Sequence, residues 1–431
     1  MTGVATRVFA DGATIRMTAF GRGLPPMPIN GCVAVTGSPA VAWRPRLTIV
    51  SSANFARAYG GVAYLAEAVH ARGTAVRVIA PIPLDQMGEV RRFSFSTKSI
   101  YSIAPRSLWL SRRVFHLELA LTGPLRKTAW LFSDLSFFRE AVAIRRLHPR
   151  SMLLHYCTEL LTPEEFPDVR GTAFYAKHAG VPDLVIDVNE GRAARRRERF
   201  GITSDVAILP NTLPLAELPP PAPPGALARL AGGDIPPDLP VLLYAGAPHP
   251  EASFDRVIAA VRETRTPLFL LAFCSGSAKQ SEALRTEVQA SLGPQRGRVC
   301  AAVPRRELLA CMHQADAGLA YYPFSAAPSW NQLHCAPTKA YEYLAAGLPV
   351  VASKNPPLVE LIAARSLGAC AADDSVAALR ATLDDLFRDR TTLRRIGERA
   401  RKVFARELSF ERVAPPVVDR VVALIDRTVP R

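Results

Sequence analysis

The hydrophobic pattern of the chain begins with a clear βαβ unit. Leu47–Val50 is a short apolar, β-prone run and predicts a buried strand. After Gly60 and Gly61, apolar residues recur at helical spacing as far as Gly73, where a glycine ends the predicted helix. Residues 75–80 then predict a second strand. Alternating strands and helices of this kind imply a parallel sheet.

The alternation continues through the first half of the chain, whereas the pattern before residue 43 is weak. We interpret residues 1–42 as an N-terminal extension and residues 43–211 as the first α/β domain. Further expected elements are helices at 130–147 and 191–200 and strands at 152–156 and 184–188.

A proline-rich stretch separates the two halves. Ten prolines lie between Pro210 and Pro240, a density that excludes helices and central strands and predicts a semi-rigid linker over residues 212–239. Residues 240–410 form a second α/β domain, and residues 411–431 predict a helix that returns toward the first. The strands expected in the second domain are 241–244, 268–273, 299–303, 317–322 and 349–352. The helices expected there are 254–265, 281–292, 305–314, 337–346, 358–364, 375–387 and 391–404.

This pattern predicts an α/β fold of two Rossmann-like, doubly wound domains that face a cleft. Such folds bind ligands outside the carboxyl ends of their strands. Chemistry-bearing residues directly after predicted strands are therefore candidates for a site.

Charge and composition narrow the class of partner. The formal net charge is +15 over 431 residues, which suits an anionic partner. The sequence has no apolar run long enough to span a bilayer and no signal-peptide core, so we expect a cytoplasmic protein. Its seven cysteines are widely spread without a CxxC pair, which predicts buried free thiols and neither a zinc site nor a dithiol motif.

The most informative stretch runs from residue 331 to 351. Pro337 suits the first turn of a helix, whose unpaired backbone amides and positive dipole end favour an anion. Lys339 adds a cation in the same turn, and Glu342 offers a carboxylate to vicinal hydroxyls such as those of a ribose. The alternative is a surface ion pair between Lys339 and Glu342 at i,i+3.

The same stretch resembles the donor-site signature of family 4-like (group 1) glycosyltransferases of the GT-B superfamily. That signature is often written P-x-K-x-x-E-Y-x-A-x-G-x-P-V-V, and its fixed positions match Pro337, Lys339, Glu342, Tyr343, Ala345, Gly347, Pro349, Val350 and Val351. The resemblance implies that the helix start at Pro337, Thr338 and Lys339 binds a diphosphate and that Glu342 holds the ribose. Tyr343 and Ala345 are expected to be packing residues.

Other positions extend the resemblance or depart from it. Many members carry a further glutamate eight positions before the conserved one, facing the donor sugar. His334 stands there instead and can hydrogen-bond a sugar hydroxyl or a phosphate, and a plain loop histidine is the alternative. Gly246 resembles the glycine of the loop that opens the donor domain in the family, and a basic diphosphate ligand commonly follows that loop. In this sequence His249 is the nearest polar candidate for that ligand. Gly60 and Gly61 resemble the glycine-rich loop of the acceptor domain, and a plain tight turn is the alternative.

Two residues of the first domain are candidates for catalysis. His155 and Glu159 lie at the carboxyl end of the strand predicted at 152–156. His155 is expected to contact the donor sugar, and Glu159 to act as a base on the acceptor hydroxyl if the enzyme inverts. A loop histidine and a helix-capping glutamate are the structural alternatives.

Several chemistries lack their motifs. The sequence has no G-x-G-x-x-G after the first strand, no Walker loop and no G-x-S-x-G elbow. It also lacks an Asp-x-Asp motif, so we expect no obligatory metal and no cofactor, with a nucleotide-diphosphate sugar as substrate.

Basic and large apolar residues mix in two segments of the first domain. The set comprises Trp109, Leu110, Arg112, Arg113, Phe115, Arg126, Lys127, Trp130, Phe132, Arg192, Arg195, Arg196 and Arg197. Such a mixture suits an anionic membrane surface, and solvated helix faces are the alternative. No nucleic-acid-binding module appears, so nucleic acid is not expected as a partner.

The sequence therefore predicts a GT-B glycosyltransferase. We expect it to move a sugar from a nucleotide diphosphate to a hydroxyl of a lipid-linked or glycan acceptor, in cell-surface polysaccharide or glycolipid synthesis. Retention is favoured over inversion. The protein is expected in the cytoplasm, peripheral on the inner face of the membrane. The alternatives are a non-catalytic GT-B-like binding subunit and a nucleotide-sugar epimerase of the same architecture.

Overall fold

The computed structural model describes residues 4–8, 14–18, 46–51, 60–80, 96–99, 128–133, 135, 137–169, 171–248, 253–324 and 328–428. The chain divides into two compact units, Met1–Trp43 and Arg44–Arg431. In the first unit, β1 (Val4–Val8) and β2 (Thr14–Thr18) pair in antiparallel fashion. The weak hydrophobic pattern of this segment did not predict these strands.

The second unit begins with a sheet of seven parallel strands in the order β5-β4-β3-β6-β7-β8-β9. The strands are β3 (Leu47–Val50), β4 (Val76–Ala80), β5 (Ser96–Ser99), β6 (Ala129–Ser133), β7 (Leu153–Cys157), β8 (Leu184–Asp187) and β9 (Asp205–Ile208). The helices are α1 (Gly61–Ala71), α4 (Phe138–Leu147), α5 (Thr172–His178) and α6 (Glu190–Phe200). Apolar strands buried on both faces are typical of a parallel sheet covered by helices.

The helix predicted over residues 130–147 is wrong in its first part. Trp130 and Phe132 lie in β6, and the helix begins only at Phe138. All five residues of β6 are buried, because the strand lies inside the sheet between β3 and β7. A short continuous apolar run does not distinguish a buried strand from a buried helix by periodicity, which explains the error.

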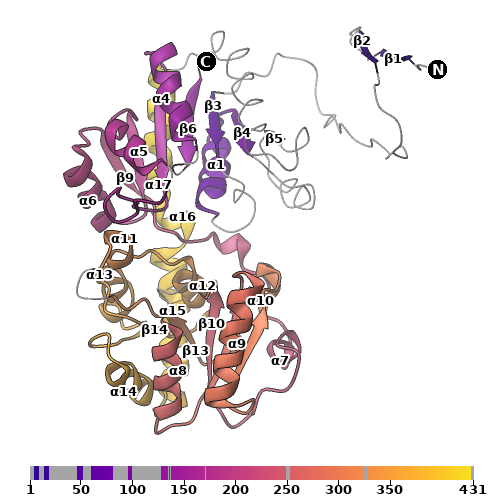
Figure 1. Cartoon of the computed structure of the whole chain (residues 1–431), viewed down its shortest axis with the longest axis vertical. Helices are drawn as coiled ribbons and strands as arrows, with labels where there is room; N and C mark the ends of the chain where they lie inside the picture. Colours follow the sequence, from indigo (N-terminus) through magenta and orange to yellow (C-terminus); the bar gives the residue numbers. More distant parts are fainter. Residues whose placement is uncertain are drawn as a thin grey trace. The chain divides into compact units, whose positions relative to one another are not determined.

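The second sheet has six parallel strands in the order β12-β11-β10-β13-β14-β15. The strands are β10 (Val241–Gly246), β11 (Phe269–Cys274), β12 (Gly297–Ala301), β13 (Ala317–Ala320), β14 (Val350–Ala352) and β15 (Gly368–Cys370). Its helical segments are α8 (Phe254–Glu263), α9 (Ala278–Leu292), α10 (Arg305–Cys311), η5 (Met312–Gln314), α11 (Trp330–Leu333), α12 (Thr338–Ala346), α13 (Pro356–Leu358), η6 (Val359–Ala363), α14 (Val376–Leu386) and α15 (Arg390–Val403). Figure 1 shows the two sheets with their helices.

The proline-rich segment contains helical turns, contrary to the prediction. These are η3 (Leu215–Glu217) and α7 (Ala226–Leu230), and α7 falls in the proline-free interval after Pro224. The backbone N–H of Ala222 donates to the carbonyl of Ala310 at 2.8 Å, and that of Leu227 to Oε1 of Gln314 at 3.1 Å. The second half of this segment is therefore folded against the C-terminal domain.

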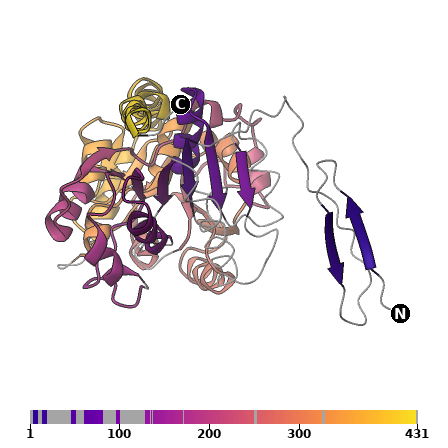
Figure 2. The same ribbon diagram turned by 90° about the horizontal axis from the view of Figure 1, so that it is seen from above.

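The chain ends by crossing back to the N-terminal domain. After η7 (Phe404–Leu408) and α16 (Phe410–Val413), α17 (Pro415–Thr428) packs against α1. Arg46 pairs with Asp426 at 2.7 Å, and Arg72 pairs with Asp419. Figure 1 shows α17, drawn in yellow, among the elements of the N-terminal domain, and Figure 2 shows the same yellow helix from above.

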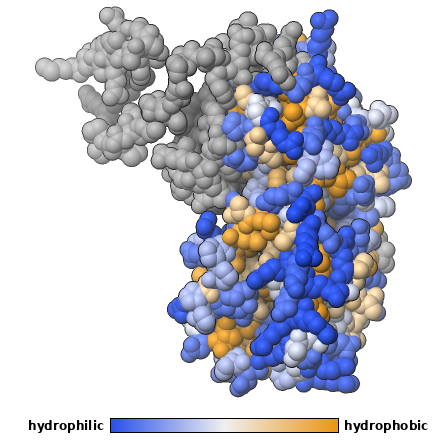
Figure 3. All heavy atoms as spheres, turned by 180° about the vertical axis from the view of Figure 1, so that it is seen from behind, coloured by the Kyte–Doolittle hydropathy of each residue, from blue (hydrophilic) through white to orange (hydrophobic). Residues whose placement is uncertain are grey.

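The described surface is mainly hydrophilic, with separate apolar patches on the face drawn in Figure 3. In the part of the chain that the structure describes, no helix combines the length and apolar character that crossing a membrane requires.

Candidate functional site

The candidate site lies where β10 ends and α12 begins. Gly246 closes β10 with a φ of 142°, in the region that favours glycine. A Cβ at this position would lie 2.7 Å from Nζ of Lys339, so the bare glycine backbone admits the ammonium group. Lys339 Nζ also lies 3.7 Å from the ring centroid of Tyr244 and 5.5 Å from that of Tyr322. The structure thus brings together two residues that are 93 positions apart.

The start of α12 has no side-chain cap. Pro337 is the N-cap and supplies no side-chain hydrogen bond, and Thr338 and Lys339 form the first turn. Amides at such a helix start point along the axis and carry the positive end of the dipole. The combination of these amides with Lys339 suits an anionic group such as a diphosphate.

Packing of Tyr343 fixes α12 against the sheet. Its hydroxyl accepts a hydrogen bond from the backbone N–H of Ala245 at 2.8 Å. Its ring lies over Gly318 of β13, where a Cβ would come within 2.3 Å of the ring carbons. Tyr343 and Ala345 are both buried, as expected of packing residues. The helix start is therefore held at the end of β10 by its own side chains.

The surroundings of Lys339 disfavour its positive charge when no ligand is bound. Burial lowers the pKa of Lys339 to about 7, while the nearby Glu342 carboxylate acts in the opposite direction. A diphosphate beside Nζ would favour the protonated form. Lys339 therefore has the properties of a group that becomes fully charged on binding an anion.

Glu342 is engaged with a cation that the sequence analysis missed. Its side chain is only 9% exposed, and its Oε1 accepts a hydrogen bond from Nε of Arg305 at 2.5 Å. Among the described residues, the Glu342 carboxylate pairs with Arg305 and not with Lys339, so the surface pair that was the alternative does not form. Arg305 begins α10 directly after Pro304, and the sequence carries no local signal for this long-range pair.

A buried polar network supports the neighbouring loops. Ser353 Oγ accepts from the backbone N–H of Tyr322 at 2.8 Å and donates to Oδ1 of Asn355 at 2.5 Å. Asn355 Nδ2 donates to the carbonyl of Gln332 at 2.8 Å. These residues follow the carboxyl end of β14, which is the signal that could have identified them.

His334 lies at a contact between the two domains. Its ring stacks on Trp330 with centroids 5.3 Å apart, and Gly191 of α6 leaves the space that the ring fills. Its carbonyl accepts from Nε of Arg192 at 2.8 Å and from Nδ2 of Asn189 at 3.0 Å. Burial and the Arg192 charge lower the pKa of His334. The ring of His334 therefore packs against α6, and its contact with a sugar or phosphate stays a prediction.

His155 and Glu159 occupy different environments. His155 is 2% exposed, between the rings of Phe138 and Tyr175 and 3.2 Å from the sulfur of Cys157. This burial does not support contact with a donor sugar. Glu159 is exposed and lies 3.4 Å from Nη1 of Arg192, so it stays accessible to a substrate.

The two glycines at the start of α1 accommodate the protein's own side chains. A Cβ on Gly60 would lie 2.1 Å from the ring of Tyr64, and one on Gly61 would lie 2.1 Å from the hydroxyl of Tyr156. The space over both glycines is therefore filled by tyrosines. The tyrosines account for both glycines by packing, and the approach of a donor or acceptor to this backbone stays a prediction.

The residues of the predicted membrane surface divide into three groups. Trp130, Phe132, Arg192 and Arg196 are buried, which corrects their assignment to a lipid-facing surface. Arg195 lies over the ring of Trp330 at 4.4 Å, whereas Arg197 is exposed. The following candidates, together with the donor-loop candidate His249, lie outside the described residues: Trp109, Leu110, Arg112, Arg113, Phe115, Arg126 and Lys127.

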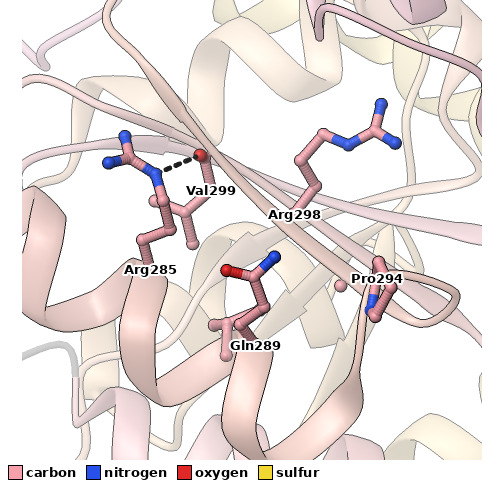
Figure 4. Close-up of a pocket in the computed structure, with 7 residues that line it drawn as sticks. Arg285, Gln289, Pro294, Arg298 and Val299 are labelled. Atoms are coloured by element: carbon pink, nitrogen blue, oxygen red, sulfur yellow. Dashed lines mark hydrogen bonds between the residues drawn. The ribbon is translucent and has the colours of Figure 1, made fainter.

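A separate small cavity lies between α9 and the edge strand β12 (Figure 4). It has a volume of about 90 Å³, and Nε of Arg285 donates across it to the carbonyl of Val299 at 3.3 Å. Arg285 is also paired with Glu282. None of the predicted site residues lines this cavity, so it is not part of the candidate site.

Comparison with known proteins agrees with this geometry. Residues 231–403 match the family model described as glycosyl transferases group 1. A search of curated protein sequences finds no match. The resemblance stated from residues 337–351 is thus confirmed by a match that spans most of the C-terminal domain.

Solved structures share the arrangement of both domains. Sucrose-phosphate synthase from Thermosynechococcus elongatus is 17% identical with a TM-score of 0.66, covering 89% of this chain and 100% of its own. A glycosyltransferase from Rickettsia africae is 12% identical with a TM-score of 0.66, covering 89% and 98%. HepE from Anabaena, solved with UDP and glucose, is 13% identical with a TM-score of 0.64, covering 87% and 99%. The predicted GT-B fold is therefore confirmed, and the family match supports glycosyl transfer as the class of activity.

Proposed function

We propose that this chain, whose residues 231–403 match the group 1 glycosyl transferases, moves a sugar from a nucleotide diphosphate to an acceptor hydroxyl. In this reaction the bond from the anomeric carbon to the diphosphate breaks and a bond to the acceptor oxygen forms. The acceptor hydroxyl loses its proton, and the nucleotide diphosphate leaves with the bonding electrons.

One observation carries the proposal: Lys339 Nζ lies beside Gly246 at the N-terminus of α12, which has no side-chain cap. Negative charge accumulates on the leaving diphosphate as the glycosidic bond breaks. Fixed amides and an ammonium group stabilise that charge without reorganisation, which is the basis of electrostatic catalysis. The proposal needs no metal for this purpose.

Glu342 would hold the nucleotide ribose. Arg305 engages Oε1 of its carboxylate, and a carboxylate has further lone pairs that can accept from vicinal hydroxyls. In support of a uridine nucleotide as the first probe, the similar structure of HepE was solved with UDP and glucose.

Glu159 is the residue that we propose to act on the acceptor. Its exposed carboxylate follows β7 and is the candidate base if the reaction inverts. The acceptor would be a hydroxyl on a lipid-linked or growing glycan. The anomeric configuration of the product distinguishes retention from inversion.

The test combines binding with turnover. Purified protein is heated with UDP, GDP or ADP, and a ligand at 100 times its Kd should add about 2.7 kcal/mol to stability. Release of UDP from UDP-glucose is then followed in EDTA with a hydroxyl acceptor. We expect one nucleotide to raise Tm and turnover to persist in EDTA. A complete, reversible loss of transfer in EDTA contradicts the metal-free mechanism, and no shift with any nucleotide contradicts the donor site.

A second candidate is a non-catalytic GT-B subunit that binds a nucleotide without turning it over. The observation that favours it is the occupation of His155 and His334 in packing contacts. Binding of UDP, GDP or ADP without release of that nucleotide from the corresponding nucleotide sugar would support this candidate.

Binding of a sugar nucleotide should depend on pH through Lys339. Its pKa of about 7 in the free protein must rise when a diphosphate binds, because the anion favours the ammonium form. Affinity should therefore be highest below pH 7 and fall as the pH rises through 7, by up to about tenfold per unit. The terminal phosphate of UDP has its own pKa near 6, so UDP-glucose is the better probe.

Calorimetry at pH 8 in two buffers of different ionisation enthalpy measures the expected proton uptake. The matched variant is Lys339→Arg, whose guanidinium stays protonated and should show none. Equal proton uptake in the wild type and this variant would assign the titration to another group.

A further inference from the structure

Arg192 of α6 holds the segment 330–336, which leads into α12. Its Nε donates to the carbonyl of His334 at 2.8 Å, and its Nη2 donates to the carbonyl of Asn331 at 3.1 Å. The Arg192 side chain is 4% exposed, so water competes little for either bond. Because the guanidinium is a rigid planar fork, it fixes the two carbonyls relative to each other. Figure 1 shows α11, in which Asn331 lies, next to α6.

Arg192 is itself fixed within the N-terminal domain. Its Nη1 donates to the carbonyl of Thr158 and lies 3.4 Å from Oε2 of Glu159. Its backbone N–H donates at 2.8 Å to Oδ1 of Asn189, the N-cap of α6. This cap bond orients the Asn189 amide, whose Nδ2 donates to the same His334 carbonyl at 3.0 Å. The start of α6 and its first arginine therefore converge on one acceptor.

Three further hydrogen bonds join the segment 330–336 to the N-terminal domain. They run from the N–H of Trp330 to Oε1 of Glu165 at 2.9 Å, from the N–H of Leu160 to Oδ1 of Asn331 at 3.0 Å, and from Nδ2 of Asn211 to the carbonyl of Ala336 at 2.9 Å. Ala336 directly precedes Pro337, the N-cap of α12. The backbone that enters the candidate donor site is therefore placed jointly by the other domain and by Asn355, which binds the Gln332 carbonyl.

Arg196, one turn later on α6, differs from Arg192 in what it holds. It is equally buried, and its side chain bonds to Asp187, Tyr175 and the carbonyl of Glu159, all within the N-terminal domain. Two of the three guanidinium nitrogens of Arg192 donate instead to the C-terminal domain. Comparing the two residues separates the loss of a buried arginine from the loss of a bond to the segment 330–336.

We propose that Arg192 is a positioning residue for the nucleotide-sugar donor. By holding the carbonyls of Asn331 and His334, it sets the path of the segment 330–336 and so places the first-turn amides of α12 and Lys339 for the diphosphate. The proposal rests on the proposed function, because it takes this helix start as the diphosphate site. Arg192 acts through the segment and not by contact with the donor.

Binding of UDP and of uridine tests this role. Arg192→Ala should weaken UDP binding about threefold to tenfold in calorimetry, since the amides and Lys339 lose their placement, and should leave uridine affinity unchanged. Uridine has the base and the ribose but no phosphate, so a general loss of folding would weaken both ligands. Arg192→Lys should recover part of the UDP affinity, because one ammonium group cannot hold both carbonyls as the fork does.

Two further variants keep the test decisive. Asn189→Ser retains a side-chain oxygen for the α6 cap and removes the donor to the His334 carbonyl, so it should weaken UDP binding without unfolding α6. Arg196→Ala is the matched control. Measured below its Tm, it should be less stable than the wild type and bind UDP with the same affinity.

The outcomes separate the role of Arg192 from the donor site itself. Unchanged UDP affinity in Arg192→Ala, an equal loss for UDP and uridine, or the same loss of UDP affinity in Arg196→Ala overturns the positioning role and leaves the donor site in place. If the wild type prefers GDP or ADP, that nucleotide is compared with its own nucleoside. If the wild type binds none of the three, the donor site fails, and the role of Arg192 fails with it.

Discussion

Replacing Arg196 by alanine is expected to lower the free energy of unfolding by about 3–5 kcal/mol. Arg196 is 2% exposed, and its Nε lies 2.8 Å from Oδ2 of Asp187, which is fully buried. The guanidinium also donates to the hydroxyl of Tyr175 at 3.0 Å and to the carbonyl of Glu159 at 3.1 Å. Alanine leaves the Asp187 carboxylate buried without its cation, and that unpaired charge is the main cost.

Urea denaturation of the variants measures this loss. The control is Arg197→Ala, which removes an exposed arginine from the same helix and should change stability by no more than about 0.5 kcal/mol. The double variant Arg196→Met with Asp187→Asn removes both charges and should recover much of the loss, because a buried pair contributes little net stability. Equal stability of Arg196→Ala and Arg197→Ala would contradict the buried pair.

Replacing Lys339 by alanine is expected to weaken nucleotide-diphosphate binding by about 1.5–3 kcal/mol, or roughly 10- to 150-fold. The variant removes the charge-assisted contact at the α12 N-terminus. Folding should not suffer, because burial already opposes the charge of Lys339 in the free protein. Calorimetry with UDP measures the affinity, and thermal unfolding measures the stability.

Two companion variants sharpen this result. Lys279→Ala removes an exposed lysine of α9 and should leave UDP affinity unchanged. Gly246→Ala places a methyl group 2.7 Å from Lys339 Nζ and strains the backbone at φ 142°, so it should weaken binding while keeping the ammonium group. Unaltered affinity in both Lys339→Ala and Gly246→Ala would remove the donor assignment from this end of β10.

The candidate donor site was predictable because its parts are local. Residues 337–351 contain the helix start, the lysine, the glycine that ends the helix and the strand that follows, so short-range patterns define them. Gly246 was predictable because it ends an apolar strand. The structure adds the distance between Gly246 and Lys339, which depends on how β10 and α12 pack.

Residues whose environment depends on distant segments were not predictable in the same way. Arg192 and Arg196 appear in a run of arginines that suggests a solvated helix face. Their partners lie on other segments, at Asn331, His334 and Asp187. Likewise, nothing near Arg305 in the sequence indicates that it contacts Glu342, 37 positions away. Burial of a charge is decided by tertiary packing, which periodicity does not report.

The return of α17 to the N-terminal domain determines when that domain can be completed during synthesis. Val421 and Ile425 belong to the same apolar core as Leu65 and Val69 of α1, yet the ribosome releases them more than 340 residues later. One core of the C-terminal domain, by contrast, is built wholly from residues 242–393. Long-range pairing of this kind delays folding and leaves apolar surface exposed to other chains. The half of the protein that is synthesised first is therefore finished last.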